Sequence, residues 1–122
     1  MSQTEERLEP DVERKLSAMW PSAADRATAR GELRRYGAES FENEVERVRM
    51  AILKLGDGSL AELRRMTDAA KLDYRDVLMW AEYPEQSQAA WSSNPNLTKE
   101  QRRELDRIRT RDQAQLREWR RK

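Results

Sequence analysis

The residues of this sequence that could do chemistry are the carboxylates of one short polar segment. Asp73 and Asp76 lie three residues apart around a Tyr-Arg pair, and Glu82 or Glu85 could complete the set from the next turns. Paired carboxylates can bind a divalent cation or share a proton, so the segment is a candidate metal or acid–base site. The same spacing is typical of a capped helix start in which Arg75 pairs with a neighbouring acid, and we favour this structural interpretation.

The composition excludes the commonest kinds of catalytic site. The 122 residues contain no Cys and no His, which removes thiolate nucleophiles, the most common general base and the most common metal ligands. The loop Gly56-Asp57-Gly58 precedes a predicted helix, but it lacks the Lys-Ser/Thr pair of a phosphate-binding loop. We therefore expect no enzyme activity and no cofactor, and we keep the carboxylate site only as a second alternative.

Aromatic residues near the end of a predicted helix form another candidate surface. Trp80 and Tyr83 lie just before Pro84, and Trp91 follows in a polar stretch. Tyr and Trp are overrepresented at binding hot spots, but they also close hydrophobic cores with their polar groups at the edge. We favour core closure and keep an interface as the functional alternative.

The last 25 residues have the pattern of an amphipathic helix with a thin apolar stripe. Leu105 and Ile108 are repeated eleven residues later as Leu116 and Trp119. An isolated amphipathic helix is marginal in water, so this one needs a surface on which to lie. We predict that it supports self-association as a homodimer or binds another protein, and its packing in cis or in trans stays open.

Charge is distributed unevenly along the chain. Residues 99–122 contain ten Lys/Arg and five Asp/Glu, a net charge of +5, whereas residues 1–98 carry a net charge of −4. Four cations at the end of the chain could contact the phosphates of a nucleic acid: Arg117, Arg120, Arg121 and Lys122. Cations also suit a helix C-terminus without any ligand, so nucleic-acid binding is the first alternative function.

Apolar spacing predicts helices almost throughout the chain. A first helix runs from near residue 5 to residue 20 and ends before Pro21, which disfavours helical geometry in the residue before it. A second helix follows a cap at Ser22 and ends at Gly37. Ser40 is expected to cap a third helix with the cleanest apolar stripe in the chain: Phe41, Val45, Val48, Ile52 and Leu55.

Turn residues separate two more helices from the third. Gly56-Asp57-Gly58 ends the third helix, and Ser59 with Glu62 forms a capping box for a fourth. The short turn makes these two helices an antiparallel hairpin. A cap at Asp73 predicts a short fifth helix that ends before Pro84.

These elements predict an all-α fold, with a compact irregular bundle of four to five helices and a long C-terminal amphipathic helix. Residues 1–84 form the helical domain, residues 85–97 are a linker, and residues 98–122 are the basic amphipathic helix. No apolar run approaches the roughly 20 residues of a membrane span, so we expect no membrane partner. The absence of cysteine is typical of the reducing cytoplasm, where we expect the protein to reside.

Three segments carry a distinctive pattern: Arg47–Gly58, Leu63-Arg64 and Ala70–Glu85. Its most specific elements are Asp-Tyr-Arg-Asp-Val-Leu and Trp-Ala-Glu-Tyr-Pro, and Trp20-Pro21 and Arg35-Tyr36-Gly37 extend it upstream. The pattern resembles that of a group of small uncharacterised bacterial proteins over residues 19 to 85. The resemblance implies a bacterial, intracellular protein and no particular activity, cofactor or site residue. The main functional prediction is therefore a non-catalytic protein that acts through protein–protein interaction and associates with itself.

Overall fold

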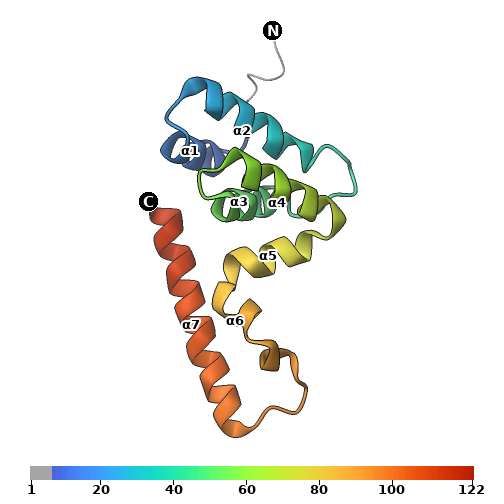
Figure 1. Cartoon of the computed structure of the whole chain (residues 1–122), viewed down its shortest axis with the longest axis vertical. Helices are drawn as coiled ribbons and strands as arrows, with labels where there is room; N and C mark the ends of the chain where they lie inside the picture. Colours follow the sequence, from blue (N-terminus) through green and yellow to red (C-terminus); the bar gives the residue numbers. More distant parts are fainter. Residues whose placement is uncertain (1–6) are drawn as a thin grey trace.

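The computed structural model describes residues 7–122, and within this range the only regular elements are helices. Seven α-helices and one 3₁₀ helix follow in order: α1 (Pro10–Met19), α2 (Ala23–Arg35), α3 (Val45–Gly56), α4 (Leu60–Leu72), α5 (Tyr74–Glu82), α6 (Pro84–Gln88), η2 (Ala90–Ser93) and α7 (Lys99–Arg121). The predicted all-α class with a long C-terminal helix is confirmed (Figure 1). The predicted helix start near residue 5 lies outside the described residues.

Side-chain caps fix the starts of four helices. In each case a short polar side chain accepts a hydrogen bond from an amide of the first turn, as predicted from the sequence: Ser22, Ser59, Asp73 and Thr98. Thr98 forms a full capping box, because it accepts a bond from the Gln101 amide at 3.1 Å while the Gln101 side chain accepts one from the Thr98 amide at 2.9 Å. Such caps satisfy amides that have no partner within the helix.

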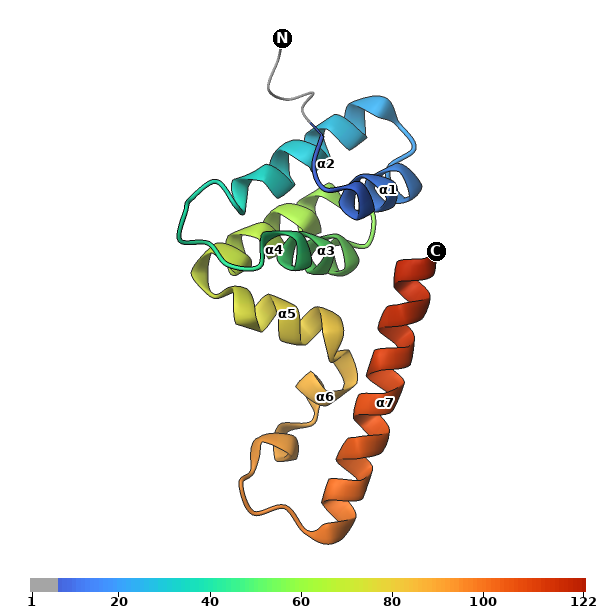
Figure 2. The same ribbon diagram turned by 180° about the vertical axis from the view of Figure 1, so that it is seen from behind.

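The hydrophobic core lies among the first five helices, with α3 at its centre. α3 packs against α1, α4 and α5, and α2 packs on α4. In Figures 1 and 2, α1 and α2 form one layer, α3 and α4 the next, and α5 lies on the far side of that second layer. All five helices contribute completely buried side chains: Val12, Leu16, Leu33, Val48, Ile52, Leu53, Leu63 and Val77. The predicted α3–α4 hairpin is part of this core.

The start of α3 differs from the prediction. Ser40 does not cap the helix, which begins only at Val45, and Phe41 does not join the buried stripe. Instead, 76% of the Phe41 side chain is exposed. The other members of the predicted stripe are buried or half-buried on α3.

The carboxylate of Glu42 explains why the helix starts late. It accepts hydrogen bonds from the Gly37 amide at 2.8 Å and from the Glu39 amide at 3.1 Å, which closes the α2–α3 loop. The Tyr36 hydroxyl donates to the Asn43 carbonyl at 2.7 Å and fixes the other side of this loop. The Glu42 side chain, three residues before α3, is therefore held by loop hydrogen bonds, and the segment around it is not helical.

The predicted linker, residues 85–97, contains the short α6 and η2 before a loop leads into α7. α7 then runs back along one flank of the molecule, and its C-terminus lies close to α1 (Figures 1 and 2). Along residues 7–122, no helix combines the length and apolarity that a bilayer span requires.

Candidate functional site

The segment around Asp73 is a capped helix start. The Asp73 carboxylate accepts hydrogen bonds from the Arg75 amide at 3.0 Å and from the Arg75 guanidinium at 3.1 and 3.2 Å. The guanidinium holds the pKa of Asp73 below its ordinary value, so the carboxylate is ionised and already paired. Asp76 is exposed in the first turn of α5, where negative charge suits the helix N-terminus.

The carboxylates that could complete a metal or acid–base site lie elsewhere. Glu82 ends α5, about 14 Å along the helix axis from Asp73. It is buried and forms a two-bond pair with Arg47, at 2.7 and 2.5 Å. Glu85 pairs with Arg111 at 2.6 Å. The structure does not bring these acids together, and residues 7–122 contain no group of three or more acidic side chains that could hold a metal ion.

The apolar stripe of α7 packs against its own chain. Leu105 and Ile108 are buried, while Leu116 and Trp119 are half-buried. α7 contacts α5 and α6, and Trp119 lies against the edge of the core. The stripe therefore has a surface in cis, and its role between two chains stays a prediction.

Two cations of α1 hold the C-terminal end of α7. The Lys15 ammonium lies 4.1 Å from the centroid of the Trp119 ring and donates to the Trp119 carbonyl. The Arg14 guanidinium donates to the Arg120 carbonyl at 2.7 Å. Carbonyls at a helix C-terminus lack intrahelical partners and carry partial negative charge, so cations stabilise them. Burial lowers the pKa of Lys15, with Arg14 adding to the effect.

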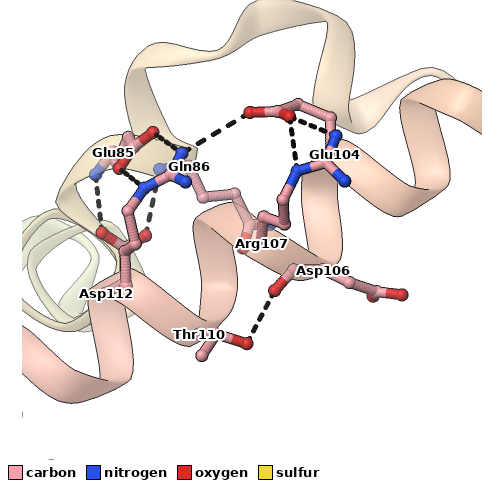
Figure 3. Close-up of polar contacts among 8 residues, drawn as sticks. Glu85, Gln86, Glu104, Asp106, Arg107, Thr110 and Asp112 are labelled. Atoms are coloured by element: carbon pink, nitrogen blue, oxygen red, sulfur yellow. Dashed lines mark hydrogen bonds and ion pairs between the residues drawn. The ribbon is translucent and has the colours of Figure 1, made fainter.

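The buried carboxylate of Asp112 joins the middle of α7 to α6 (Figure 3). It accepts hydrogen bonds from the amides of Glu85 at 3.0 Å and Gln86 at 3.1 Å, in the first turn of α6. The Arg111 guanidinium binds both oxygens of Glu85, at 3.0 and 2.6 Å. Asp112 thus serves as the N-terminal cap of a helix that has no cap of its own.

The aromatic residues of the predicted interface lie on α5, at its C-terminal end and on η2. Trp80 is 40% exposed, and it borders one cavity with Leu55 and Met66 and another with Ala89. Tyr83 is half-buried at the junction of α5 and α6, and Trp91 is half-buried in η2. The Trp80 side chain is thus less exposed than the two apolar side chains described next, Phe41 and Leu72.

The most exposed apolar side chains of the described chain meet at a different place. Leu72 is 90% exposed at the end of α4, and Phe41 lies across from it on the α2–α3 loop. Both border a cavity of about 390 Å³, which we call the Phe41–Leu72 cleft. Its lining residues come from the loop and from the junction of α4 and α5: Tyr36, Phe41, Glu42, Asn43, Ala70, Lys71, Leu72, Asp73, Tyr74 and Arg75.

Charged side chains of both signs surround this cleft. The Lys71 ammonium contacts the Glu42 carboxylate at 3.1 Å and donates to the Arg35 carbonyl at 2.8 Å. Burial raises the pKa of Glu42, but bonds from two loop amides and from Lys71 outweigh it, and the net pKa lies below its ordinary value. The rim thus consists of ionised pairs, one at Glu42 and one at Asp73.

Sequence reasoning missed Leu72 as a surface residue, although periodicity could have identified it. The buried positions of α4 are Leu63, Met66, Thr67 and Ala70, and residue 72 falls outside this series. No comparable signal was available for Phe41, because the loop that exposes it depends on hydrogen bonds to Glu42.

The predicted phosphate contacts lie at the exposed end of α7. All four of these residues are exposed: Arg117, Arg120, Arg121 and Lys122. Arg121 pairs with Glu118 of the same helix. Three further exposed arginines were missed: Arg102, Arg103 and Arg109. For Arg102 and Arg109 the signal is helical spacing, since residues 102, 109, 117 and 120 fall on one side of a helix, and Arg103 lies about 100° further round the helix axis.

Comparison of the chain with protein families, with curated proteins and with solved structures finds no match.

Proposed function

We propose that the protein is not an enzyme and acts through protein–protein interaction, pairing with a second copy of itself at the Phe41–Leu72 cleft. One observation carries this proposal. Two large apolar side chains, with 76% and 90% of their surfaces exposed, border the same cavity. Scattered exposed apolar residues are ordinary, whereas a cluster rimmed by charged groups is typical of an interaction surface.

Two features favour a second copy as the partner. The rim holds two cations, Lys71 and Arg75, and two carboxylates, Glu42 and Asp73, so its formal charge is zero. A patch with both signs of charge can face its own two-fold copy without net repulsion, as a symmetric dimer requires. The apolar stripe of α7, which was the other candidate, already has its partners in cis.

The expected association is weak. Burial of one Leu or Phe side chain contributes about 1.5–3 kcal/mol, so two from each copy contribute roughly 6–12 kcal/mol. Loss of translational and rotational freedom opposes association by roughly 4–15 kcal/mol. The most favourable difference between these two terms is about 8 kcal/mol, which corresponds to a dissociation constant near 1 µM, so we expect a weaker one, between about 10 µM and 1 mM.

Sedimentation equilibrium over this concentration range tests the proposal. We expect the wild-type chain to shift from monomer to dimer, and the double variant Phe41→Ser/Leu72→Gln to stay monomeric. Met79→Gln is the matched control, because Met79 is an exposed apolar residue of α5 outside the cleft. All three sites are exposed, so melting followed by circular dichroism should be nearly unchanged. A monomeric wild type, or equal loss of dimer in the control, contradicts the proposal.

The remaining functional predictions are supported by fewer observations. The metal or acid–base alternative has no supporting observation among the described residues, because Asp73 and Glu82 are each paired with an arginine. A cytoplasmic location is supported by the lack of cysteine in the 122 residues. A bacterial origin is supported by the resemblance of residues 19 to 85.

A further inference from the structure

We propose that the outer face of α7 binds the phosphate backbone of duplex DNA. The outer face consists of five exposed cations that helical spacing brings to one side of the helix: Lys99, Arg102, Arg103, Arg109 and Arg117. The apolar stripe with Leu105 and Ile108 lies on another side and is turned into the molecule. This inference is independent of the Phe41–Leu72 cleft, which shares no residue with the outer face.

The acids of α7 leave the outer face strongly basic. Glu104 pairs with Arg107 and Arg111, and Glu118 pairs with Arg121.

The other three acids of α7 differ in their positions. Asp112 is buried against α6, Glu100 is exposed in the first turn of α7 next to Lys99, and Asp106 is exposed at an outer-face position. No carboxylate within residues 7–122 forms an ion pair with any of the five outer-face cations. Arg109 donates one bond to the neutral side chain of Gln86, at 3.1 Å, so all five charges remain available to an external anion. We leave Arg120 out of this set, because it shares a cavity with the acids Asp11 and Glu46.

The geometry of the outer face suits a long, regular polyanion. From Lys99 to Arg117 the helix axis spans about 27 Å, along which a DNA duplex carries roughly 16 phosphate charges. Four of the five cations are arginines, whose planar guanidinium can bind two phosphate oxygens at once. α7 forms one flank of the molecule in both views, so a rod-shaped partner can lie along it (Figures 1 and 2).

Duplex DNA fits this face better than other anionic partners. The major groove of B-form DNA admits an α-helix, whereas the corresponding groove of duplex RNA is too deep and narrow. Single strands are bound largely by stacking on aromatic side chains, and the five positions include none. A membrane surface binds helices that offer it apolar side chains, but the apolar side of α7 is occupied by α5 and α6.

Fluorescence anisotropy with a labelled duplex of arbitrary sequence tests the inference. For five neutralised phosphates, the binding constant should fall about 500-fold between 50 and 200 mM salt. Replacing three outer-face cations with glutamine, Arg102→Gln/Arg103→Gln/Arg117→Gln, should weaken binding at 50 mM salt by roughly 100-fold or more. Glutamine keeps the helix propensity of arginine, so the melting temperature should be unchanged.

The matched control removes the same charge from α2 and α4, as Arg26→Gln/Arg64→Gln/Arg65→Gln. It should bind the duplex within about threefold of the wild type, because these arginines lie outside the phosphate contacts that set the affinity. Three results would overturn the inference: no duplex binding at 50 mM salt, equal loss in the control, or equal or tighter binding to duplex RNA, single strands or anionic vesicles.

Discussion

The position of Phe41, on which the proposed dimer depends, is set by two residues of the α2–α3 loop. Gly37 has a φ of +100°, a conformation that residues with a Cβ rarely adopt. Glu42 is a carboxylate whose bonds to loop amides and to Lys71 hold its pKa below the ordinary value despite its burial. A specific backbone conformation of the α2–α3 loop therefore places the Phe41 ring at the surface.

Replacing Gly37 with alanine should test this dependence. An added Cβ would lie 2.6 Å from Val45 Cγ1 and 2.8 Å from Arg49 Nη2, in addition to the strain of positive φ. We expect Gly37→Ala to lower the free energy of unfolding by more than about 2 kcal/mol, measured by urea denaturation. Gly58→Ala is the control: its φ is +80°, but nothing lies within 4 Å of the added Cβ.

The control should cost about 1–2 kcal/mol, which is the price of the left-handed conformation alone. Equal losses of stability in Gly37→Ala and Gly58→Ala would mean that the α2–α3 loop adapts to the added methyl group and does not hold Phe41 rigidly.

Among the helices, α6 depends most on a distant part of the chain. Its own N-cap, Tyr83, offers no side-chain hydrogen bond, and its first two free amides are satisfied by Asp112 from α7. A helix of this length is not stable in isolation. The contact between α6 and α7 therefore stabilises the short α6 helix and fixes α7 against it.

Asp112→Asn should loosen α6 selectively. The variant keeps the shape of the side chain but loses its charge and one acceptor, so we expect a loss of about 1–3 kcal/mol in unfolding free energy. Hydrogen exchange at the amides of Glu85 and Gln86 should accelerate. Asp106→Asn, an exposed acid on the same helix, should change stability by less than about 0.5 kcal/mol. Unchanged exchange at the α6 amides in Asp112→Asn would contradict the capping role.

The start of a helix could be predicted from the sequence where its capping residue is a neighbour in the chain. The helices α2, α4, α5 and α7 begin at caps supplied by neighbouring residues, and their starts were predicted correctly. α6 was missed because its cap lies 26 and 27 residues further along the chain. The predicted start of α3 was too early, because the Glu42 carboxylate binds a loop amide and the segment that follows Ser40 is a loop.

For the molecule as a whole, the two proposed surfaces lie on opposite flanks. Figures 1 and 2 show the α2–α3 loop and the α4–α5 junction on one side and α7 on the other. α7 is attached through cations of the body that bind its carbonyls and side-chain amides, including Lys15 and Lys54. Arg102, Arg103 and Arg117 of α7 remain exposed, and a dimer formed at the cleft would present two basic outer faces.

The uneven charge along the sequence correctly indicated that α7 has its own character, but it did not indicate how α7 docks. Net charges of −4 and +5 favour attraction between body acids and tail bases. The structure shows one such pair, between Arg111 of α7 and Glu85 at 2.6 Å. The other contacts have the opposite polarity, because Lys15 and Arg14 of the body bind carbonyls of α7 and the α7 acid Asp112 binds amides of α6. Net charge describes a whole segment, whereas docking depends on which few groups are buried.

Site-directed cross-linking tests the central claim, a dimer that joins two Phe41–Leu72 clefts, most directly. The chain has no native cysteine, so a single one at Asn43→Cys or, as the control on the opposite flank, at Gln113→Cys reacts without background. Asn43 is an exposed residue of the cleft lining whose side chain is not one of the two apolar groups that drive the dimer. With a short bismaleimide at submillimolar protein, we predict a covalent dimer from Asn43→Cys and little from Gln113→Cys. No dimer at position 43, or equal yields at the two positions, would contradict the account.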